Sequence, residues 1–395
     1  MITVEEAEKI IQSKVKNFGI ENIPFDDALG RVLAADITAD RDLPPFNRVT
    51  MDGIAISFDA LENGIHSFKI IATQAAGYTT IDINDPGECI EIMTGAALPA
   101  TTDTVIRYED TIIENGIATI TTPSVTKGQS IHLKGKDKKQ HEVVAFANEL
   151  ITPAIIGIAA SVGRKTLAVK KLPRVIIISS GDELVEVNEK PSPFQIRRSN
   201  NYMIKAVLQQ YCLHADMQHL PDDLEKTKKL IVKCLETYDV IIVSGGISMG
   251  KFDHLPQALA SVSVTKLFHK VQQKPGKPFW FGVDKNDSLV FAFPGNPVST
   301  FMCLHRYFLP WLCASAGLLI DKEHAILSED FSFMPNLVYF LQVKLTKEKG
   351  KILATPVEGN GSGDFSNLLQ TQAFMELPAE QNNFAKGEIF RIWPY

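Results

Sequence analysis

The sequence has few cysteines, no block of basic residues and no long hydrophobic run. Its 395 residues include five cysteines, and none of these forms a C-x-x-C pair. A disulfide framework and a cysteine zinc site are therefore not expected, and a reducing compartment such as the cytoplasm fits. The net charge is −6 without a Lys/Arg cluster, so the chain is not expected to bind nucleic acid or an anionic membrane surface.

Segments typical of membrane insertion or secretion are also lacking. The longest apolar stretch, LITPAIIGIAASVG, is shorter than the roughly 20 residues that a membrane helix needs. The beginning, MITVEEAEKIIQ, is acidic and has helical periodicity, which is not typical of a signal peptide. Thr3 and Glu6 there predict a helix with a capping box. A hydrophobic content of 45% allows a sizeable core, and the length predicts roughly two to three domains.

The texture of the sequence changes twice along the chain. Between about residues 53 and 135, short alternating runs rich in Thr, Ile and Val are separated by Gly, Pro and Asp, which predicts a β-rich domain. A helix is predicted over about 152–163. From RVIIIS onward, apolar strand runs alternate with helical stretches at 199–211 and 223–236, which predicts a doubly wound α/β domain with a parallel sheet. From about residue 322, short strand-like pieces predict a C-terminal β unit.

Three predicted strands of the α/β domain end in unusual residues. These ends are IIISSGDEL, IIVSGGISMGKFD and VFAFPGNPVS. Ligands of open parallel sheets bind beyond the carboxyl ends of the strands, and glycines there let a ligand approach backbone N–H groups. In the third motif, Asn296 is predicted as a helix N-cap and Pro297 as the first helical residue, which adds N–H donors suited to phosphate. Each loop alone would also fit a simple tight turn, but three together predict an anion pocket.

Charged residues lie close to these loops in the sequence. Lys270, Lys274 and Lys277 occur in HKVQQKPGKPFWFG and suit an oxyanion, although a solvated basic loop is an equal alternative. The acids at the strand ends are predicted to hold Mg²⁺ beside a phosphate chain: Asp182, Glu183, Asp222 and Asp253. Asp222 has an alternative role as the N-cap of the following helix. No base is evident for Ser244, so the pattern favours metal and oxyanion handling over covalent catalysis.

Several motifs, in this order, resemble the molybdopterin molybdenumtransferase family (the MoeA and gephyrin E-domain type) over nearly the whole chain. They are PPFNRVTMDGIAI, IMTGAALP, LKGKD, SSGDEL, SGGISMGKFD, KPGKPFWFG, FPGNPVS and GNGSGDF. The resemblance implies a multidomain α/β plus β fold. Its parts are a split helical domain (1–43 and 138–171), a β-rich insert (44–137), a doubly wound α/β molybdopterin-binding domain (172–320) and a C-terminal β domain (321–395).

The resemblance also implies a reaction and its partners. Adenylylated molybdopterin and molybdate, the substrates, would give molybdenum cofactor and AMP with the help of Mg²⁺, and a molybdopterin adenylyltransferase would act upstream. The enzyme would be an elongated homodimer whose active site lies between the α/β domain of one subunit and the insert of the other.

Site residues follow from the family motifs position by position. The implied catalytic residues are Asp52, Asp137, Glu183, Asp222 and Asp253, with Glu183, Asp222 and Asp253 as metal ligands. The implied substrate-binding residues are Thr94, Ser244, Gly245, Gly246, Ser248, Gly250, Lys270, Lys274, Lys277, Pro294, Gly295, Asn296, Pro297 and Ser362. Of these, Lys274 and Lys277 are expected to bind molybdate, with Ser362 as a further contact.

Three positions depart from the family pattern. The lead into MDG reads NRVT, Lys136 precedes Asp137, and Arg198 stands in QIRRSN where an Asp is usual. Arg198 either removes an acidic contact or binds phosphate. Two alternatives stay open: a molybdopterin adenylyltransferase-like or nucleotide-processing enzyme that shares only the sheet domain, and a non-catalytic scaffold. The upstream MDG and MTG motifs favour the transferase over the first alternative, and the set of acids and lysines favours it over the second.

Overall fold

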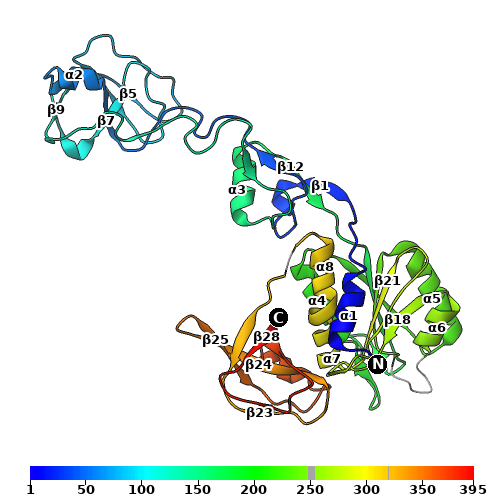
Figure 1. The fold of residues 1–395 in the computed structure, drawn as a ribbon. Helices are drawn as coiled ribbons and strands as arrows, with labels where there is room; N and C mark the ends of the chain where they lie inside the picture. The colour runs from blue at the N-terminus through cyan, green and yellow to red at the C-terminus, as the bar shows by residue number, and fades with distance from the viewer. Residues whose placement is uncertain (248–253, 319) are drawn as a thin grey trace.

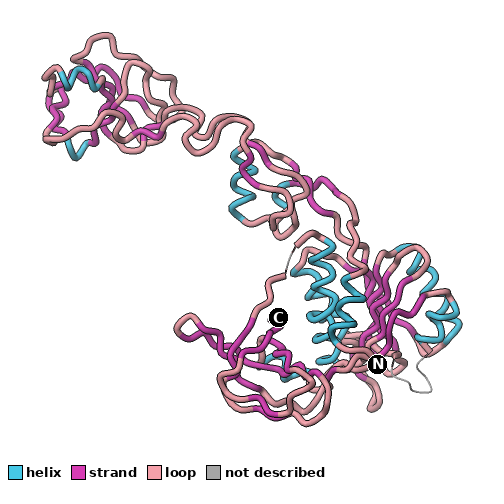
Figure 2. The backbone as a smooth tube through the Cα atoms, in the orientation of Figure 1, coloured by secondary structure: helices cyan, strands magenta, loops and turns pink. Residues whose placement is uncertain are grey.

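The computed structural model describes residues 1–247, 254–318 and 320–395. The molecule is elongated (Figure 1): the β-rich insert lies at one end, and the α/β sheet and the C-terminal strands lie together at the other. Figure 2 shows that helices gather around the α/β sheet, whereas the two β-rich parts consist mainly of strands and loops. Within the described parts, no helix has the length and apolar character required to cross a bilayer.

The region between the two ends is built from two separated stretches of sequence. Its elements are β1 (Ile20–Pro24), η1 (Phe25–Asp27), β2 (Ile37–Thr38), β11 (Val143–Ala145), α3 (Pro153–Ser161) and β12 (Thr166–Lys170). β1 pairs with β12 and β2 pairs with β11, both antiparallel. Apolar side chains from both stretches, such as Leu33 and Leu167, share one small core. The chain therefore leaves this region for the insert and returns to it.

The insert is β-rich, as predicted. Its elements are β3 (Arg48–Val49), β4 (Gly53–Ile56), α2 (Phe58–Glu62), β5 (Ser67–Gln74), β6 (Glu88–Ile92), β7 (Thr104–Arg107), η2 (Tyr108–Asp110), β8 (Thr111–Glu114), β9 (Ile117–Ile120) and β10 (Ile131–His132). Six strands form one sheet in the order β7-β4-β6-β5-β9-β8. The alternation seen in the sequence buries apolar residues such as Ile54 and Ile90 on the two faces of this sheet, which gives two separate small cores.

The large sheet has helices on both faces. Its elements are β13 (Val175–Ser180), β14 (Leu184–Val185), β15 (Ile196–Arg197), α4 (Asn200–Gln210), β16 (Ala215–Leu220), α5 (Leu224–Thr237), β17 (Val240–Ser244), α6 (Leu255–Ser261), β18 (Thr265–His269), β19 (Gln273–Lys274), β20 (Trp280–Val283), β21 (Leu289–Phe293), α7 (Pro297–Cys303), η3 (Leu304–Phe308) and α8 (Leu309–Ser315). Helices α5 and α6 cover one face; α4, α7 and α8 cover the other, together with α1 (Val4–Gln12). This arrangement confirms the doubly wound α/β fold.

Strand direction differs from the expectation at one edge of this sheet. The order is β16-β13-β17-β21-β20-β18. The first four strands are parallel, but β20 runs antiparallel to β21, and β18 antiparallel to β20. The physical reason is the short connection between β20 and β21, where the Asp284 carboxylate accepts hydrogen bonds from Asn286 N and Ser288 N, both 2.8 Å. A hairpin of this length leaves no room for the crossover that parallel strands need.

The C-terminal part is a second six-stranded sheet. It contains β22 (His324–Leu327), β24 (Val338–Glu348), β25 (Lys351–Pro356), β26 (Ala373–Leu377) and β28 (Ile389–Pro394), and β19 adds to it as an edge strand. The remaining elements are β23 (Phe331–Ser332), η4 (Phe365–Gln370) and β27 (Asn383–Phe384). Because β19 belongs to the KPGKP segment, this sheet is hydrogen-bonded directly to a segment that was predicted to bind substrate.

Helix α1, at the N-terminus, packs on the α/β domain and is connected to the C-terminal sheet. Thr3 and Glu6 form the predicted capping box, with Thr3 N donating to the Glu6 carboxylate over 2.8 Å. Arg306, only 2% exposed, forms ion pairs with Glu8 of α1 at 2.7 Å and with Glu376 of β26 at 3.2 Å. One buried guanidinium thus holds α1, the helical layer and the C-terminal sheet in a fixed arrangement.

Candidate functional site

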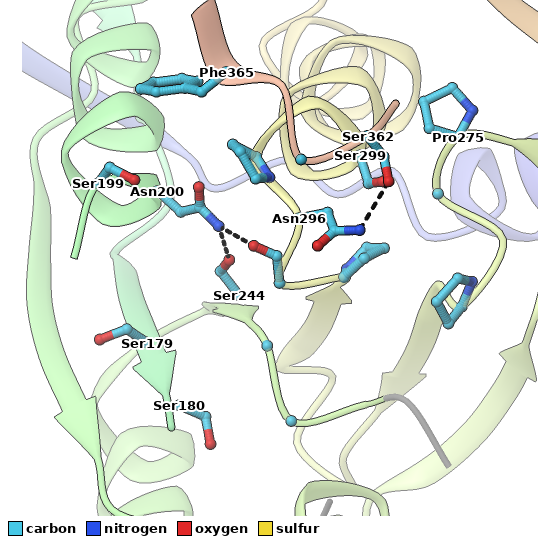
Figure 3. A pocket seen from close by; sticks show the side chains of 18 of the residues that line it. Ser179, Ser180, Ser199, Asn200, Ser244, Pro275, Asn296, Ser299, Ser362 and Phe365 are labelled. Atoms are coloured by element: carbon cyan, nitrogen blue, oxygen red, sulfur yellow. Dashed lines mark hydrogen bonds between the residues drawn. The ribbon is translucent and has the colours of Figure 1, made fainter. Parts of the chain in front are cut away.

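A cavity of about 800 Å³ lies beyond the carboxyl ends of β13, β17 and β21. The C-terminal segment 362–365 and the turn 273–278 close its other sides (Figure 3). The lining includes eleven residues that the sequence predicted: Glu183, Ser244, Gly245, Gly246, Lys274, Lys277, Pro294, Gly295, Asn296, Pro297 and Ser362. Three further predicted residues, Ser248, Gly250 and Asp253, lie outside the described residues.

The two adjacent glycines after β17 are required by the backbone. Gly245 has φ +96°, and a Cβ there would come within 2.8 Å of the Ser180 carbonyl oxygen. Gly246 has φ +70°, and its Cβ would lie 3.0 Å from Ser180 Oγ. A side chain at either position would be strained and would push against the neighbouring strand end. The loop therefore passes close to β13 and leaves its backbone facing the cavity.

Asn200, at the start of α4, joins two of these strand ends and was not predicted. Its Nδ2 donates to Ser244 Oγ over 2.8 Å and to the Gly295 carbonyl over 2.7 Å (Figure 3). Its Oδ1 is buried without a hydrogen-bond partner among the described atoms. A buried acceptor without a partner is costly, so this oxygen is available to a donor group of a ligand. The only signal in the sequence was the Ser-Asn pair after Arg198.

The N-terminus of α7 confirms Asn296 as the N-cap position and Pro297 as the first helical residue. The Asn296 side chain makes no capping hydrogen bond, and its Nδ2 donates to Ser362 Oγ over 2.8 Å. The Val298 amide donates to the Ser362 carbonyl over 3.2 Å. One of the N–H groups expected to face a phosphate is therefore already used by the C-terminal segment. Ser362 instead becomes part of the wall between the two domains.

Lys274 and Lys277 flank the turn and both line the cavity. The Lys274 ammonium lies 5.4 Å from the ring centre of Phe333 and 5.9 Å from that of Tyr339, within the range of cation–π attraction. These two rings are stacked, with centres 4.2 Å apart. Aromatic rings from the C-terminal domain thus orient a cation at the cavity wall. Lys270, the third predicted lysine, is not among the lining residues, and its backbone N–H donates to the Phe279 carbonyl.

The acids near β13 form a local arrangement. The Asp182 carboxylate accepts from Asp222 N over 3.0 Å, and the Asp222 carboxylate accepts from Asp182 N over 3.4 Å. The Glu183 carboxylate folds back over Gly181, where a Cβ would come within 2.3 Å of it. Asp223, not Asp222, is the N-cap of α5, so the alternative role considered for Asp222 is wrong. Neither Asp222 nor Asp182 is a lining residue, but Asp182 directly precedes Glu183, which is one.

Arg198 also faces this cavity. Its side chain is 13% exposed and forms an ion pair with Glu186, and it lines the cavity together with Arg197. Its charge lowers the pKa of His219, an effect second to burial, whereas Asp182 and Asp222 raise that pKa. The guanidinium and the two acids therefore act on one histidine. Arg198, which stands where the family usually has an Asp, thus places a cation close to Asp182 and Asp222.

The predicted site residues within 44–137 form two small groups, one in the insert, which lies at the opposite end of the molecule, and one where the chain leaves the insert beside Leu43. One Asp52 carboxylate oxygen accepts from both Thr94 N and Thr94 Oγ1, each over 2.7 Å, and these bonds lower the pKa of Asp52. Asp137 lies 2.8 Å from His132 Nε2. Figure 1 places this end far from the α/β sheet of the same chain. A single chain therefore does not bring Asp52, Thr94 and Asp137 to the cavity.

Comparisons with known proteins cover each of these parts. Three family models match: the MoeA N-terminal region (domains I and II) at residues 2–163, a probable molybdopterin-binding domain at 176–314, and the MoeA C-terminal region (domain IV) at 324–395. A molybdopterin molybdenumtransferase from Synechocystis is 40% identical, with 100% of both chains covered. One from Staphylococcus epidermidis is 32% identical over 99% of this chain and 95% of its own length.

Solved structures agree with the sequence matches. The structure of a molybdopterin biosynthesis MoeA protein from Pyrococcus horikoshii covers 100% of both chains with a TM-score of 0.84 and 27% identity. Because the similarity includes the insert and the C-terminal sheet, it is not limited to the α/β domain. The chain belongs to the molybdopterin molybdenumtransferase family.

Proposed function

We propose that this protein is an enzyme of molybdenum cofactor biosynthesis that inserts molybdate into adenylylated molybdopterin and releases AMP. The observation that carries the proposal is the combination, in one cavity, of open backbone at Gly245 and Gly246 with the cations Lys274, Lys277 and Arg198. Both substrates bring negative charge, one as a pyrophosphate and one as an oxyanion. Backbone N–H groups and positioned cations bind such groups well.

The cavity supports separate places for the two anions. The glycine loop and Arg198 belong to the side formed by β13, β15 and β17, and we assign the pyrophosphate to this side. The lysines belong to the turn on the other side, and we assign molybdate to them. Asn200 Oδ1 lies between these walls as an acceptor for a donor group of the pterin. This arrangement would place molybdate next to the pyrophosphate linkage, which is the bond that is broken when AMP is released.

Mg²⁺ fits the acidic edge of the cavity as a shared ligand. The described residues contain no group of three or more His, Cys, Asp or Glu that alone would hold a metal ion. However, Mg²⁺ is commonly held by one or two carboxylates together with substrate phosphates. Glu183 and Asp222 are the acids that would hold it, and Asp253 is a further candidate from the sequence. When bound there, Mg²⁺ would neutralise charge on the pyrophosphate.

We also propose a homodimer in which the insert of one subunit completes the cavity of the other. The support is that Asp52, Thr94 and Asp137 match family positions, whereas none of them lines the cavity of its own chain. The four-domain division with boundaries near residues 43, 137, 171 and 320 belongs to the same proposal. So do a cytoplasmic location, which suits the five free cysteines, and a molybdopterin adenylyltransferase as the upstream supplier.

The direct test is to incubate the protein with adenylylated molybdopterin, molybdate and Mg²⁺ and to follow AMP release. We expect AMP to appear in proportion to cofactor formed, and to require all three additions. No AMP above a protein-free control would contradict the proposed activity. A partner protein retained independently of pterin, without AMP release, would favour the scaffold alternative.

Lys274→Ala tests the molybdate assignment. The variant should need at least about tenfold more molybdate for half-maximal activity, because a lost hydrogen bond to a charged group costs about 1.5–3 kcal/mol. Binding of the adenylylated pterin should change less. The matched control is Lys285→Ala, which removes an exposed lysine from the β20–β21 hairpin of the same domain. An unchanged molybdate dependence in Lys274→Ala would reject the assignment.

Arg198→Gln tests the pyrophosphate assignment. Inorganic pyrophosphate should compete with the adenylylated substrate roughly tenfold less well in the variant, because a charge-assisted contact is lost. Half-saturation by molybdate should stay the same. Arg174→Gln, at the opposite ends of the strands, is the control and should leave competition unchanged. If pyrophosphate competes equally well against both variants, Arg198 does not bind this group.

A further inference from the structure

A buried pair of polar side chains lies beneath the turn that carries the two lysines. Gln273 is 0% exposed and Tyr307 is 1% exposed. The Tyr307 hydroxyl donates to Gln273 Oε1, and Gln273 Nε2 donates to the Gly276 carbonyl over 2.9 Å. A polar chain in such a site restricts geometry strongly, because each broken bond leaves a buried group without a partner.

The helix that carries Tyr307 is locally altered at this point. Residues Leu304–Phe308 form a π-helical turn between α7 and α8. Such turns insert one extra residue and re-aim side chains, and they are frequent at functional sites. Burial raises the pKa of Tyr307 well above its usual value, so the hydroxyl keeps its proton and remains a donor. That donor requires the oxygen of the Gln273 amide, which leaves the nitrogen facing Gly276.

The turn above this pair is closely packed as well as hydrogen-bonded. Gly276 has φ +82°, and a Cβ there would lie 2.8 Å from Cys303 Sγ and 2.9 Å from Met302 Cε of α7. The Lys277 carbonyl accepts from Val271 N over 3.0 Å. The backbone of the turn is therefore held at Gly276 by its packing against α7 and at Lys277 by the hydrogen bond from Val271.

We propose that Gln273 and Tyr307 are positioning residues that fix the turn so that Lys274 and Lys277 converge on one oxyanion. The inference rests on the proposed molybdate site. Two ammonium groups on a free loop would move apart, since like charges repel, and the protein would have to bring them together on binding. The buried Gln273–Gly276 bond holds the turn in the binding geometry beforehand, as preorganised sites require.

The test separates positioning from stability by means of a double variant. Gln273→Met keeps the side-chain volume but removes both hydrogen bonds, and Tyr307→Phe removes only the hydroxyl. In the full-length protein, Gln273→Met should raise the molybdate concentration for half-maximal AMP release about tenfold. It should also raise amide hydrogen exchange in the peptide 273–281, with little change in the half-saturating concentration of the adenylylated pterin.

The double variant Gln273→Met/Tyr307→Phe no longer contains the Tyr307 hydroxyl that Gln273→Met leaves unpaired, so its Tm should recover part of the way towards the wild-type value. Its molybdate dependence should not recover, because the Gly276 carbonyl still lacks its donor. Ile231→Ala, in the core on the other face of the sheet, is the control for lost stability, and it should lower Tm without changing molybdate dependence.

Recovery of molybdate dependence together with Tm in the double variant would make the pair purely structural and overturn the inference. An equal rise in the half-saturating molybdate concentration of Ile231→Ala would also overturn the inference. If Lys274→Ala weakens molybdate use but Gln273→Met does not, only the positioning role falls. If Lys274→Ala itself has no effect, the proposed molybdate site falls, and the positioning role falls with it.

Discussion

Mixing two inactive variants, Asp52→Asn and Glu183→Gln, should restore about a quarter of the wild-type activity once subunits have exchanged. Random pairing of equal amounts makes about half of the dimers mixed, and the two-fold axis gives each dimer two equivalent sites. In each mixed dimer, one composite site carries both lesions and the other carries neither. Each variant alone should be nearly inactive, because all of its sites carry one lesion.

The expectation comes from the distance between two well-formed half-sites. Asp52 accepts two hydrogen bonds from Thr94, stays exposed, and does not line the large cavity of its own chain. Glu183 lines the large cavity beyond the strands of the α/β sheet. Figure 1 shows that this sheet and the insert lie at opposite ends of the molecule. In the proposed dimer, this exposed and preorganised aspartate would be covered by the cavity of the second subunit.

A second mixture is the control for the first. Glu183→Gln and Lys274→Ala both alter the α/β side of the cavity, so every site in their mixed dimer still carries one lesion, and activity should not recover at limiting molybdate. Subunit exchange is verified separately by mass spectrometry of differently labelled chains. If the Asp52→Asn mixture stays inactive after verified exchange, each site is built within one subunit.

Much of the fold follows from short-range patterns that physical chemistry makes reliable. The capping box at Thr3 and Glu6, the run Val175–Ser180 and the run Leu289–Phe293 were predicted and are confirmed. These elements depend on neighbouring residues or on continuous burial, which a single sequence reveals. The antiparallel direction of β20 and β18 was not foreseen, because direction depends on how a hairpin folds rather than on the composition of either strand.

The site was predictable where one residue type was needed for a local reason. Gly245 and Gly246 are required by positive φ and by the approach to Ser180, so their motif was informative. Asn200 and the Gln273–Tyr307 pair were missed, because their roles depend on partners 44 and 34 residues away in sequence. The position of Arg198 was noted, but only the fold shows that its charge faces the cavity.

The largest single-variant effect is expected for Glu183→Gln. This change removes one negative charge and keeps the shape of the side chain, so the fold should survive. AMP release should fall about a hundredfold, since groups that stabilise charge in a transition state are commonly worth that much or more. The Mg²⁺ concentration needed for half-maximal rate should rise, because Glu183 is one of the two described acids proposed to hold the ion. The measurement is the rate of AMP release over a Mg²⁺ titration.

Asp223→Asn provides a matched control for Glu183→Gln, because it removes a neighbouring charge that has a different task. Asp223 caps α5 by accepting from Lys226 N over 3.0 Å, and asparagine caps helices about as well. This variant should therefore keep both the wild-type rate and the wild-type Mg²⁺ dependence. Asp222→Asn should behave like Glu183→Gln rather than like Asp223→Asn, although the two aspartates are adjacent, because Asp222 bonds to Asp182, the residue next to Glu183. If Asp222→Asn and Glu183→Gln both titrate with Mg²⁺ as the wild type does, these acids do not hold the ion.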